Sequence, residues 1–343
     1  MSSKYPKQQP TSVKDVARLS GTSLGTVSRV LNKSSSVSAK ARAQVEKAIA
    51  ELGYEPNAGA RQMRSGRSGL VGVLLPSLDV PFFGILAQGL EQALFANGYH
   101  CLICNTEENV DNEKRYISTL IGQQVDGIIA AAVATTENFK RLSDQNIPII
   151  AVDRSPDGIT DNLVSVDHQE GGRLMAEYLL RLGHRQFGIV AAPTHSMPIT
   201  LRLKGIEEAL AEHGLKPVSV SLGEEHSFDA CFALARSVLA HSRPTVLIGT
   251  TDIAAIGAIH AAHECGLRIP QDISVIGFDN LPQSAHIIPT LTTVEQPISL
   301  LGELSAKMLL NRIDPVRFVQ PDLSQLSLRI IERDSTGVAP QVL

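Results

Sequence analysis

Apolar residues recur at helical spacing in three short segments near the start of the chain. The first begins at Ser12, where Asp15 stands three residues on as a capping-box partner, and it ends at Gly21. A second helix is expected to begin at Ser23, and a third runs from Ser38 to Gly53. The expected inward positions are Val13, Val16, Ala17 and Leu19, then Val27, Val30 and Leu31, then Val45, Ile49 and Leu52.

After a small, basic linker at residues 64–69 the pattern changes to continuous apolar runs that alternate with helical segments. Strands that are apolar throughout are typical of a parallel sheet covered on both faces. Expected strands are Leu70–Leu75, Cys101–Asn105, Gly127–Ala132, Pro148–Val152, Phe187–Ala191, Thr245–Gly249 and Ile273–Phe278. This pattern predicts two doubly wound α/β units.

Charge separates the two parts of the chain. Residues 1–67 hold twelve Lys or Arg against four Asp or Glu, a formal charge of +8 in a chain of −4, so residues 68–343 carry −12. A basic head on an acidic body is typical of a protein that binds nucleic acid. On charge alone, an ordinary three-helix module with a solvated basic face would fit as well.

Two short helices joined by a glycine turn and braced by a third predict a helix-turn-helix, whose second helix enters the DNA major groove. The outward positions of that helix include Leu24, Gly25, Ser28, Arg29 and Asn32. Gly25 offers no side chain to a base edge. We therefore expect operator reading through Arg29, contacts of Leu24, and DNA shape.

The head resembles the DNA-binding domain of the lactose-repressor (LacI) family. The family's DVA, TVSRVLN, VSAKTR and ELGYxPN stand here at residues 15–17, 26–32, 37–42 and 51–57. The resemblance implies a hinge helix at 57–64, with Met63 where the family usually has a leucine wedge for the minor groove. Residues expected to contact DNA are Ser23, Leu24, Gly25, Thr26, Ser28, Arg29, Asn32, Asn57, Ala60 and Met63.

The body is similar to the same family over about residues 70–333, and through it to periplasmic sugar-binding proteins. The resemblance implies that the chain crosses between lobes near 159–167 and 291–296. It places the helix 298–312 and the final strands back in the first lobe. The expected domains are residues 1–56, a hinge and linker at 57–69, and an effector domain at 70–343. Its first lobe covers about 70–160 and 297–333, and its second about 164–292.

Polar side chains follow several of the expected strands, where ligands bind in such sheets. Carboxylates and arginines together suit sugar hydroxyls, which both donate and accept hydrogen bonds, and aromatic rings cover apolar sugar faces. By position the set looks like a ribose-type site, with Thr251 where the family usually has asparagine. The candidates are Phe82, Phe83, Asp153, Arg154, Arg202, Phe228, Thr251, Asp279 and Gln296.

Alternatives stay open for this site. Taken singly, Asp153 and Asp279 could be strand-end caps and Arg202 a surface ion-pair partner. A purine or nucleoside is a second ligand class, and Arg202 with Lys204 would tolerate a sugar phosphate. Whether the effector releases or promotes DNA binding is not encoded in these patterns.

The resulting hypothesis is a DNA-binding regulator, expected to be a repressor, that binds a near-palindromic operator in double-stranded DNA as a homodimer and responds to a small sugar. The C-terminal STGVAPQVL carries no heptads, so we expect no further assembly. An enzyme would need a nucleotide or phosphate loop, and neither GxGxxG after a strand nor GxxxxGK[ST] occurs. A polar start without an apolar run predicts a cytoplasmic protein. Cys101 and Cys104 lack partners for zinc, and no cofactor or metal is expected.

Overall fold

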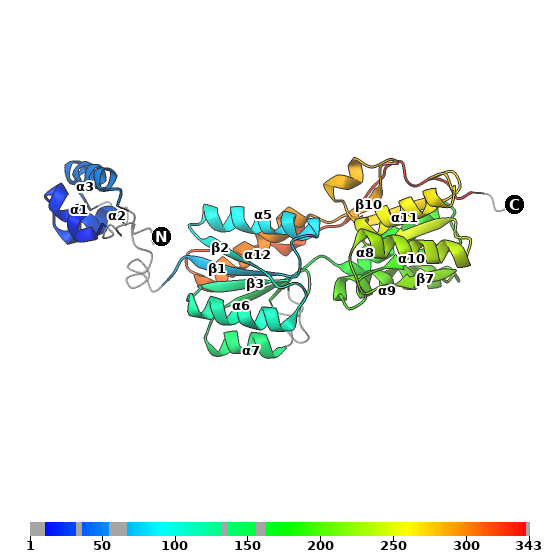
Figure 1. Cartoon of the computed structure of the whole chain (residues 1–343), viewed down its shortest axis with the longest axis horizontal. Coiled ribbons are helices and arrows are strands. Elements are labelled where there is room, and N and C mark those ends of the chain that lie inside the picture. Colours follow the sequence, from blue (N-terminus) through cyan, green and yellow to red (C-terminus); the bar gives the residue numbers. More distant parts are fainter. Residues whose placement is uncertain (1–10, 32–35, 55–66, 132–135, 156–161, 341–343) are drawn as a thin grey trace, which may run out of the picture. The chain divides into compact units, whose positions relative to one another are not determined.

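The computed structural model describes residues 11–31, 36–54, 67–131, 136–155 and 162–340. These residues form two compact units, which meet in sequence at Ser68 and Gly69 (Figure 1). The first is the helical head, and the second is an α/β body with two lobes.

The head contains α1 (Val13–Ser20), α2 (Leu24–Leu31) and α3 (Ala39–Leu52). The predicted capping box is present, because the Ser12 amide donates to Asp15 Oδ2 (3.0 Å) and the Asp15 amide donates to Ser12 Oγ (3.4 Å). The hydrogen bond from the Ser12 side chain is the main reason that the pKa of Asp15 lies below its usual value. Gly21 ends α1 in the left-handed conformation at φ 63°, which glycine adopts without a steric cost.

The core of the head follows the predicted apolar positions with one exception. Val16, Val27 and Val45 are fully buried and contribute to one cluster. Leu19 was expected on the inner face of the first helix, but it is 48% exposed. It lies two positions after Ala17, which is about 200° around an α-helix and therefore away from the buried stripe.

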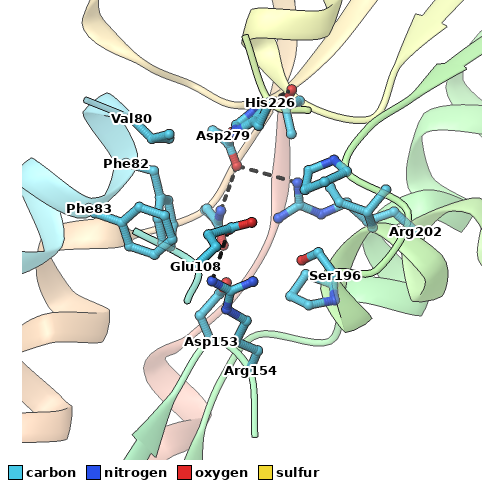
Figure 2. A pocket seen from close by; sticks show the side chains of 15 residues that line it. Val80, Phe82, Phe83, Glu108, Asp153, Arg154, Ser196, Arg202, His226 and Asp279 are labelled. Atoms are coloured by element: carbon cyan, nitrogen blue, oxygen red, sulfur yellow. Dashed lines mark hydrogen bonds and ion pairs between the residues drawn. The ribbon is translucent and has the colours of Figure 1, made fainter. Parts of the chain in front are cut away.

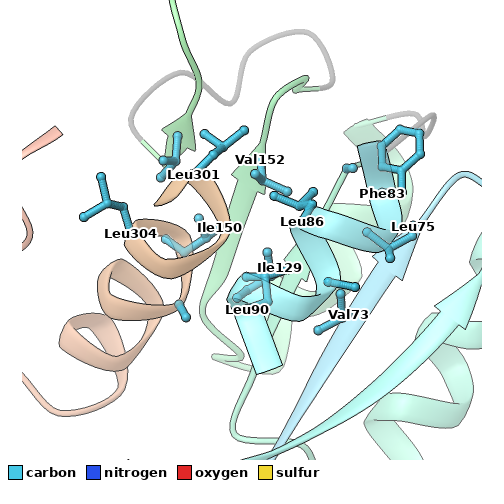
Figure 3. Packing of buried hydrophobic residues seen from close by; sticks show 14 of the residues in the cluster. Val73, Leu75, Phe83, Leu86, Leu90, Ile129, Ile150, Val152, Leu301 and Leu304 are labelled. Atoms are coloured by element: carbon cyan, nitrogen blue, oxygen red, sulfur yellow. The ribbon is translucent and has the colours of Figure 1, made fainter. Parts of the chain in front are cut away.

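The first lobe is a parallel sheet in the order β2-β1-β3-β4-β5, covered on both faces by helices. One face packs against α5 and α12, where Leu86, Leu90 and Leu301 are fully buried (Figure 3). The other face packs against α6 and α7 through Ile117, Leu120 and other apolar side chains. Its elements are β1 (Leu70–Leu75), α5 (Pro81–Ala96), β2 (His100–Asn105), α6 (Val110–Gly122), β3 (Gly127–Ala130), α7 (Thr136–Asp144), β4 (Ile149–Val152), β5 (Leu163–Val164) and α12 (Ile298–Ile313).

The second lobe repeats this layering around a sheet in the order β11-β10-β9-β8-β6-β7, in which only the β11–β10 pair is antiparallel. Helices α8 and α9 cover one face, and α10 and α11 cover the other. Its elements are α8 (His168–Arg181), β6 (Phe187–Ala191), α9 (Met197–Glu212), β7 (Ser219–Leu222), α10 (Phe228–His241), β8 (Val246–Gly249), α11 (Asp252–Glu264), β9 (Ser274–Asp279), η1 (Pro282–Ala285), β10 (Thr292–Glu295), η2 (Leu323–Gln325) and β11 (Arg329–Ile331).

The chain passes between the lobes more often than predicted. It leaves the first sheet after β5, returns after β10 to place α12 beside α5, and then crosses once more. The expectation that the final strand belongs to the first lobe is wrong, because β11 pairs with β10 in the second sheet. The strand is set by a long-range pairing, and its three residues, one exposed and two half-buried, carry no pattern that would predict that pairing.

Candidate functional site

A cavity lies between the two lobes, at the carboxyl ends of strands from both sheets (Figure 2). Its volume is about 50 Å³, and it adjoins a wider cleft of about 790 Å³. Eight of the nine predicted effector residues line it: Phe82, Phe83, Asp153, Arg154, Arg202, Thr251, Asp279 and Gln296. Sequence positions between 82 and 296 are thus brought to one place by the two lobes.

Asp279 and Arg202 form the buried polar centre on the side of the second lobe. Arg202 Nη1 lies 3.5 Å from Asp279 Oδ1, and the Gln296 amide donates to the same oxygen at 2.6 Å. Asp279, the last residue of β9, has a φ of 123°, a strained value for a non-glycine residue. Burial raises the pKa of Asp279 even though Arg202 opposes this shift. Arg202 is 3% exposed, so it is no surface ion-pair partner.

Asp153 and Arg154 form the corresponding pair after β4 in the first lobe. Asp153 Oδ1 lies 3.1 Å from His168 Nε2, and Arg154 Nη2 donates to Glu108 Oε1 at 3.2 Å. Burial alone would raise the pKa of Asp153, but His168 and the two guanidinium groups outweigh it and hold that pKa below its usual value. This carboxylate is therefore ionised at neutral pH.

Apart from Asp153 Oδ1, which lies 3.1 Å from His168 Nε2, two buried polar atoms of the cavity have no hydrogen-bond partner within the described part of the chain. They are Gln296 Oε1, an acceptor, and Arg154 Nε, a donor, on side chains whose residues are 3% and 6% exposed. An unmet buried donor or acceptor costs about 1–3 kcal/mol. A ligand that supplies one donor and one acceptor would recover this free energy.

The aromatic wall comes from the start of α5. The rings of Phe82 and Phe83 meet edge to face, with centroids 5.0 Å apart, and both residues also belong to the core of the first lobe. Figure 2 shows them across the cavity from Arg202. They can cover an apolar ligand face while the polar groups bind its hydroxyls.

Thr251 lines the cavity, and its hydroxyl also has two partners within the second lobe. Its hydroxyl caps α11 by accepting from the Ala254 amide (3.1 Å), and it lies 3.0 Å from His226 Nε2. Thr251 therefore orients His226, which also lines the cavity. Burial, with the nearby positive charges of Arg202 and Arg154, lowers the pKa of His226 to about 4, so the ring is neutral at pH 7.

The structure does not place Phe228 with the other eight predicted residues. Phe228 begins α10, is 40% exposed, stacks on Phe232, and lines the adjoining wider cleft. The aromatic position of the second lobe in the cavity is instead held by the ring of His226, two residues earlier.

Sequence reasoning missed three polar lining residues, Glu108, Ser196 and His226. Glu108 and Ser196 follow the strands β2 and β6, so the strand-end rule could have found them. His226 follows β7, an edge strand with two serines and half-exposed positions that gave no strand signal. The remaining lining is apolar and consists of Val80, Pro193, Pro198 and Ile199.

In the head, the predicted DNA-contacting face of α2 is open to solvent. Ser23, Leu24, Gly25 and Arg29 are exposed, and Thr26 and Ser28 are half-buried. Arg29 Nε donates to the carbonyl of Gly25 at 3.1 Å, one turn back on the same helix. Asn32, Asn57, Ala60 and Met63, with the expected hinge helix, lie outside the described residues.

The described part of the chain shows neither a metal-binding cluster nor a membrane-spanning helix. No group of three or more His, Cys, Asp or Glu is placed there to hold a metal ion. None of its helices combines the length and apolar character that crossing a bilayer requires. Cys101 and Cys104 are free thiols, and burial raises the pKa of Cys101 to about 11.

Comparison with known proteins gives matches along nearly the whole chain. Residues 12–57 match the model of bacterial regulatory proteins of the lacI family, and residues 68–331 match that of periplasmic binding proteins and the sugar binding domain of the LacI family. The ribose operon repressor of Halalkalibacterium halodurans is 35% identical over 308 residues, covering 89% of this chain and 91% of that protein. The repressor PurR of Edwardsiella ictaluri is 35% identical over 338 residues, covering 96% and 97%.

A solved structure agrees. The lac repressor dimer bound to operator and the anti-inducer ONPF superimposes with a TM-score of 0.86 at 32% identity, covering 96% of this chain and 100% of that chain. These relatives are transcriptional repressors rather than enzymes. The chain belongs to the LacI family of bacterial transcriptional regulators.

Proposed function

We propose that this regulator is a repressor that binds a near-palindromic operator as a homodimer. A small, ribose-like sugar in the cavity between the lobes either lowers or raises its affinity for the operator. The observation that carries the ligand class is the pairing of two carboxylates with two guanidinium groups beside two aromatic rings. Each sugar hydroxyl can donate to a carboxylate and accept from an arginine, and charge strengthens both bonds.

The DNA-binding half of the proposal rests on the head. A basic unit with an exposed α2 face suits the major groove, and a homodimer would present two such helices to two half-sites. The lac repressor structure with its operator supports this arrangement by likeness. Residues 57–64 would carry the hinge that links cavity occupancy to DNA affinity.

The effector is coupled to DNA through linkage. A ligand that binds one arrangement of the lobes more tightly shifts the population towards it, and the DNA affinity changes by the same coupling free energy. The second ligand class, a purine or nucleoside, is supported by the PurR relative, whose identity equals that of the ribose repressor.

The test is a thermal-shift screen of the full chain against pentoses, hexoses, purine bases and nucleosides. A ligand at a hundred times its dissociation constant adds about 2.7 kcal/mol of stability, which is measurable. A hit is then added to operator-binding measurements. Stabilisation by ribose together with a changed operator affinity supports the proposal; stabilisation by purines alone rejects the sugar but leaves the regulator.

Matched variants locate the ligand. Phe82→Leu should weaken binding of the hit, because Phe82 lines the cavity, whereas Phe228→Leu should leave it unchanged, because Phe228 lies in the outer cleft. Equal losses in both variants would place the ligand across the two spaces.

A further inference from the structure

The cavity holds more carboxyl groups than guanidinium groups, although burial raises the pKa of one carboxyl, that of Asp279. Glu108, Asp153 and Asp279 supply three carboxyl groups and Arg154 and Arg202 two guanidinium groups, and no lysine of the described residues lines it. The sequence left a phosphate-bearing sugar open through Lys204. That side chain is 58% exposed and lies 3.8 Å from Glu208, outside the cavity.

Arg202 is already held by several groups of the second lobe. Its Nη1 donates to the Thr250 carbonyl at 2.8 Å, its Nε donates to His168 Nδ1 at 3.3 Å, and it lies 3.5 Å from Asp279. The guanidinium also stacks 3.6 Å above the centre of the Phe278 ring. Its Nε and Nη1 groups are therefore engaged within the protein, and a phosphate could reach them only by displacing these partners.

Arg154 is the other cation of the cavity, and it forms an ion pair with Glu108. One oxygen of Glu108 accepts from Arg154 Nη2 at 3.2 Å, and the other lies 2.8 Å from His195 Nε2 of the second lobe. Burial works to raise the pKa of Glu108, but Arg154 and His195 outweigh it and hold that pKa below its usual value, so the carboxylate is ionised. In Figure 2, Glu108 stands between the aromatic wall and Arg154.

The backbone fixes this carboxylate in place. Glu107 and Glu108 both have positive φ values, 55° and 52°, which non-glycine residues rarely adopt. The Glu108 amide donates to the Pro76 carbonyl at 3.1 Å, which holds the turn against the end of β1. Strain of this kind persists where the surrounding structure over-determines the conformation.

The unmet oxygen of Gln296 favours a hydroxyl over an anion. A hydroxyl can donate to Gln296 Oε1, whereas an ionised phosphate group offers only acceptors. The adjoining cleft is lined by Asp79, Glu107, Glu224 and Glu225 as well as Glu108, with no lysine or arginine among its described lining residues. An anion would meet like charge along this wall before it reached the cavity.

We propose that Glu108 is the residue that makes this effector site selective for an uncharged, hydroxyl-rich ligand and excludes its phosphorylated form. The proposal rests on the proposed function of the same cavity. Glu108 acts by neutralising Arg154, the cation that a phosphate could otherwise bind. Its contact with His195 holds the carboxylate beside the Arg154 guanidinium.

The experiment is calorimetric titration of the full chain with matched pairs: ribose and ribose 5-phosphate, glucose and glucose 6-phosphate, adenosine and adenosine monophosphate. In the wild type, the uncharged member of the pair binds at least about tenfold more tightly, since like charges a few ångströms apart repel by more than this ratio requires. Glu108→Gln keeps the shape and frees Arg154, so the ratio should move towards the phosphate by about tenfold.

The control is Glu91→Gln, which removes one charge from an exposed position of α5 that lines neither the cavity nor the wider cleft. It should leave the ratio within about twofold, because its charge is solvated and screened. His195→Gln should move the ratio in the same direction as Glu108→Gln, by less, because the carboxylate stays but loses its anchor.

Three results would overturn the assignment: tighter wild-type binding of a phosphate than of its uncharged partner, an unchanged ratio in Glu108→Gln, or the same shift in Glu91→Gln. If adenosine binds and ribose does not, the sugar effector fails while the charge rule is still tested within the nucleoside pair. If only phosphates bind, the charge rule fails and the regulator remains.

Discussion

His226 shows how one half-buried side chain affects the polarity of the effector site. Its ring lines the cavity beside Thr251 and two arginines, and burial is the main reason that its pKa falls from 6.5 to about 4. A charged ring here would add a third cation to the lining. Because the His226 ring is neutral, the charged groups that can contact the ligand are the carboxylates and the two paired guanidinium groups.

This lowered pKa predicts a pH dependence of stability. Between about pH 6.5 and 4 the unfolded chain binds a proton at His226 that the folded chain does not, so folding weakens as the pH falls. Relative to His226→Gln, the wild type should lose about 1–3 kcal/mol over this window. Urea unfolding at several pH values measures the difference.

The control for this series is His241→Gln, which removes an exposed histidine at the end of α10. Its unfolding free energy should run parallel to that of the wild type across the same window. Parallel curves for His226→Gln and the wild type would mean that the ring is hydrated and titrates normally in the folded protein.

Residue-level reasoning found most of the site because strand ends are readable from sequence. Asp153 and Asp279 each follow an apolar run, and parallel strands bring such positions to one edge. Phe228 and His226 mark the limit of this reasoning. Whether the ring of Phe228 or that of His226 lines the cavity depends on where α10 begins. The residues before that helix follow β7, an edge strand that was not predicted.

At the scale of elements, close helix packing positions the aromatic wall. Helices α5 and α12 approach through Gly89 and Gly302, where an added Cβ on Gly302 would stand 2.5 Å from the Leu86 carbonyl oxygen and one on Gly89 would overlap that of Ser299. Phe82 and Phe83 lie at the start of α5. The depth of this helix therefore sets how far the rings reach into the cavity.

Two alanine substitutions in α5 should have opposite effects. Gly89→Ala forces α12 away and should cost about 1–3 kcal/mol of unfolding free energy, with weaker ligand binding. Gly84 has no atom within 4 Å of an added Cβ, so Gly84→Ala should be neutral or stabilise by up to about 1 kcal/mol through helix propensity. Denaturant unfolding of both variants measures this contrast, and equal effects would refute the close-packing argument.

The predicted strands that the structure confirms are continuous apolar runs, such as β1 and β9, which are buried along almost their whole length. Those that escaped prediction are short or lie at the sheet edges. In β7 half-buried and exposed positions alternate, and β5 has only two residues. The local sequence pattern of either strand therefore does not distinguish it from a loop. Their pairing partners, distant in sequence, decide their structure.

At the scale of the whole body, three chain crossings tie the lobes together and one of them enters the site. Gln296 follows β10 at the return to the first lobe, and its side chain both lines the cavity and donates to Asp279. A ligand hydroxyl on its free oxygen would therefore act on a connection between the lobes. Few-residue connections of this kind are where hinge motion takes place.

The third crossing gives the final prediction. Ser335, after β11, is fully buried in the second lobe, where its hydroxyl donates to the Val275 carbonyl (2.7 Å) and accepts from the Thr292 amide (2.8 Å). Ser335→Ala leaves both groups unpaired and should cost about 2–4 kcal/mol. Ser324→Ala, at an exposed position in η2, is the matched control and should have little effect.

Hydrogen exchange measures which lobe loses stability in Ser335→Ala. If the end of the chain belongs to the second lobe, amides of β9 and β10 should exchange faster in Ser335→Ala while those of β1 and β3 keep their protection. Faster exchange in β1 and β3 would instead support the placement that sequence alone suggested, with the final strand in the first lobe. The two sheets share no strand, so the second lobe can lose this anchor while the first stays intact.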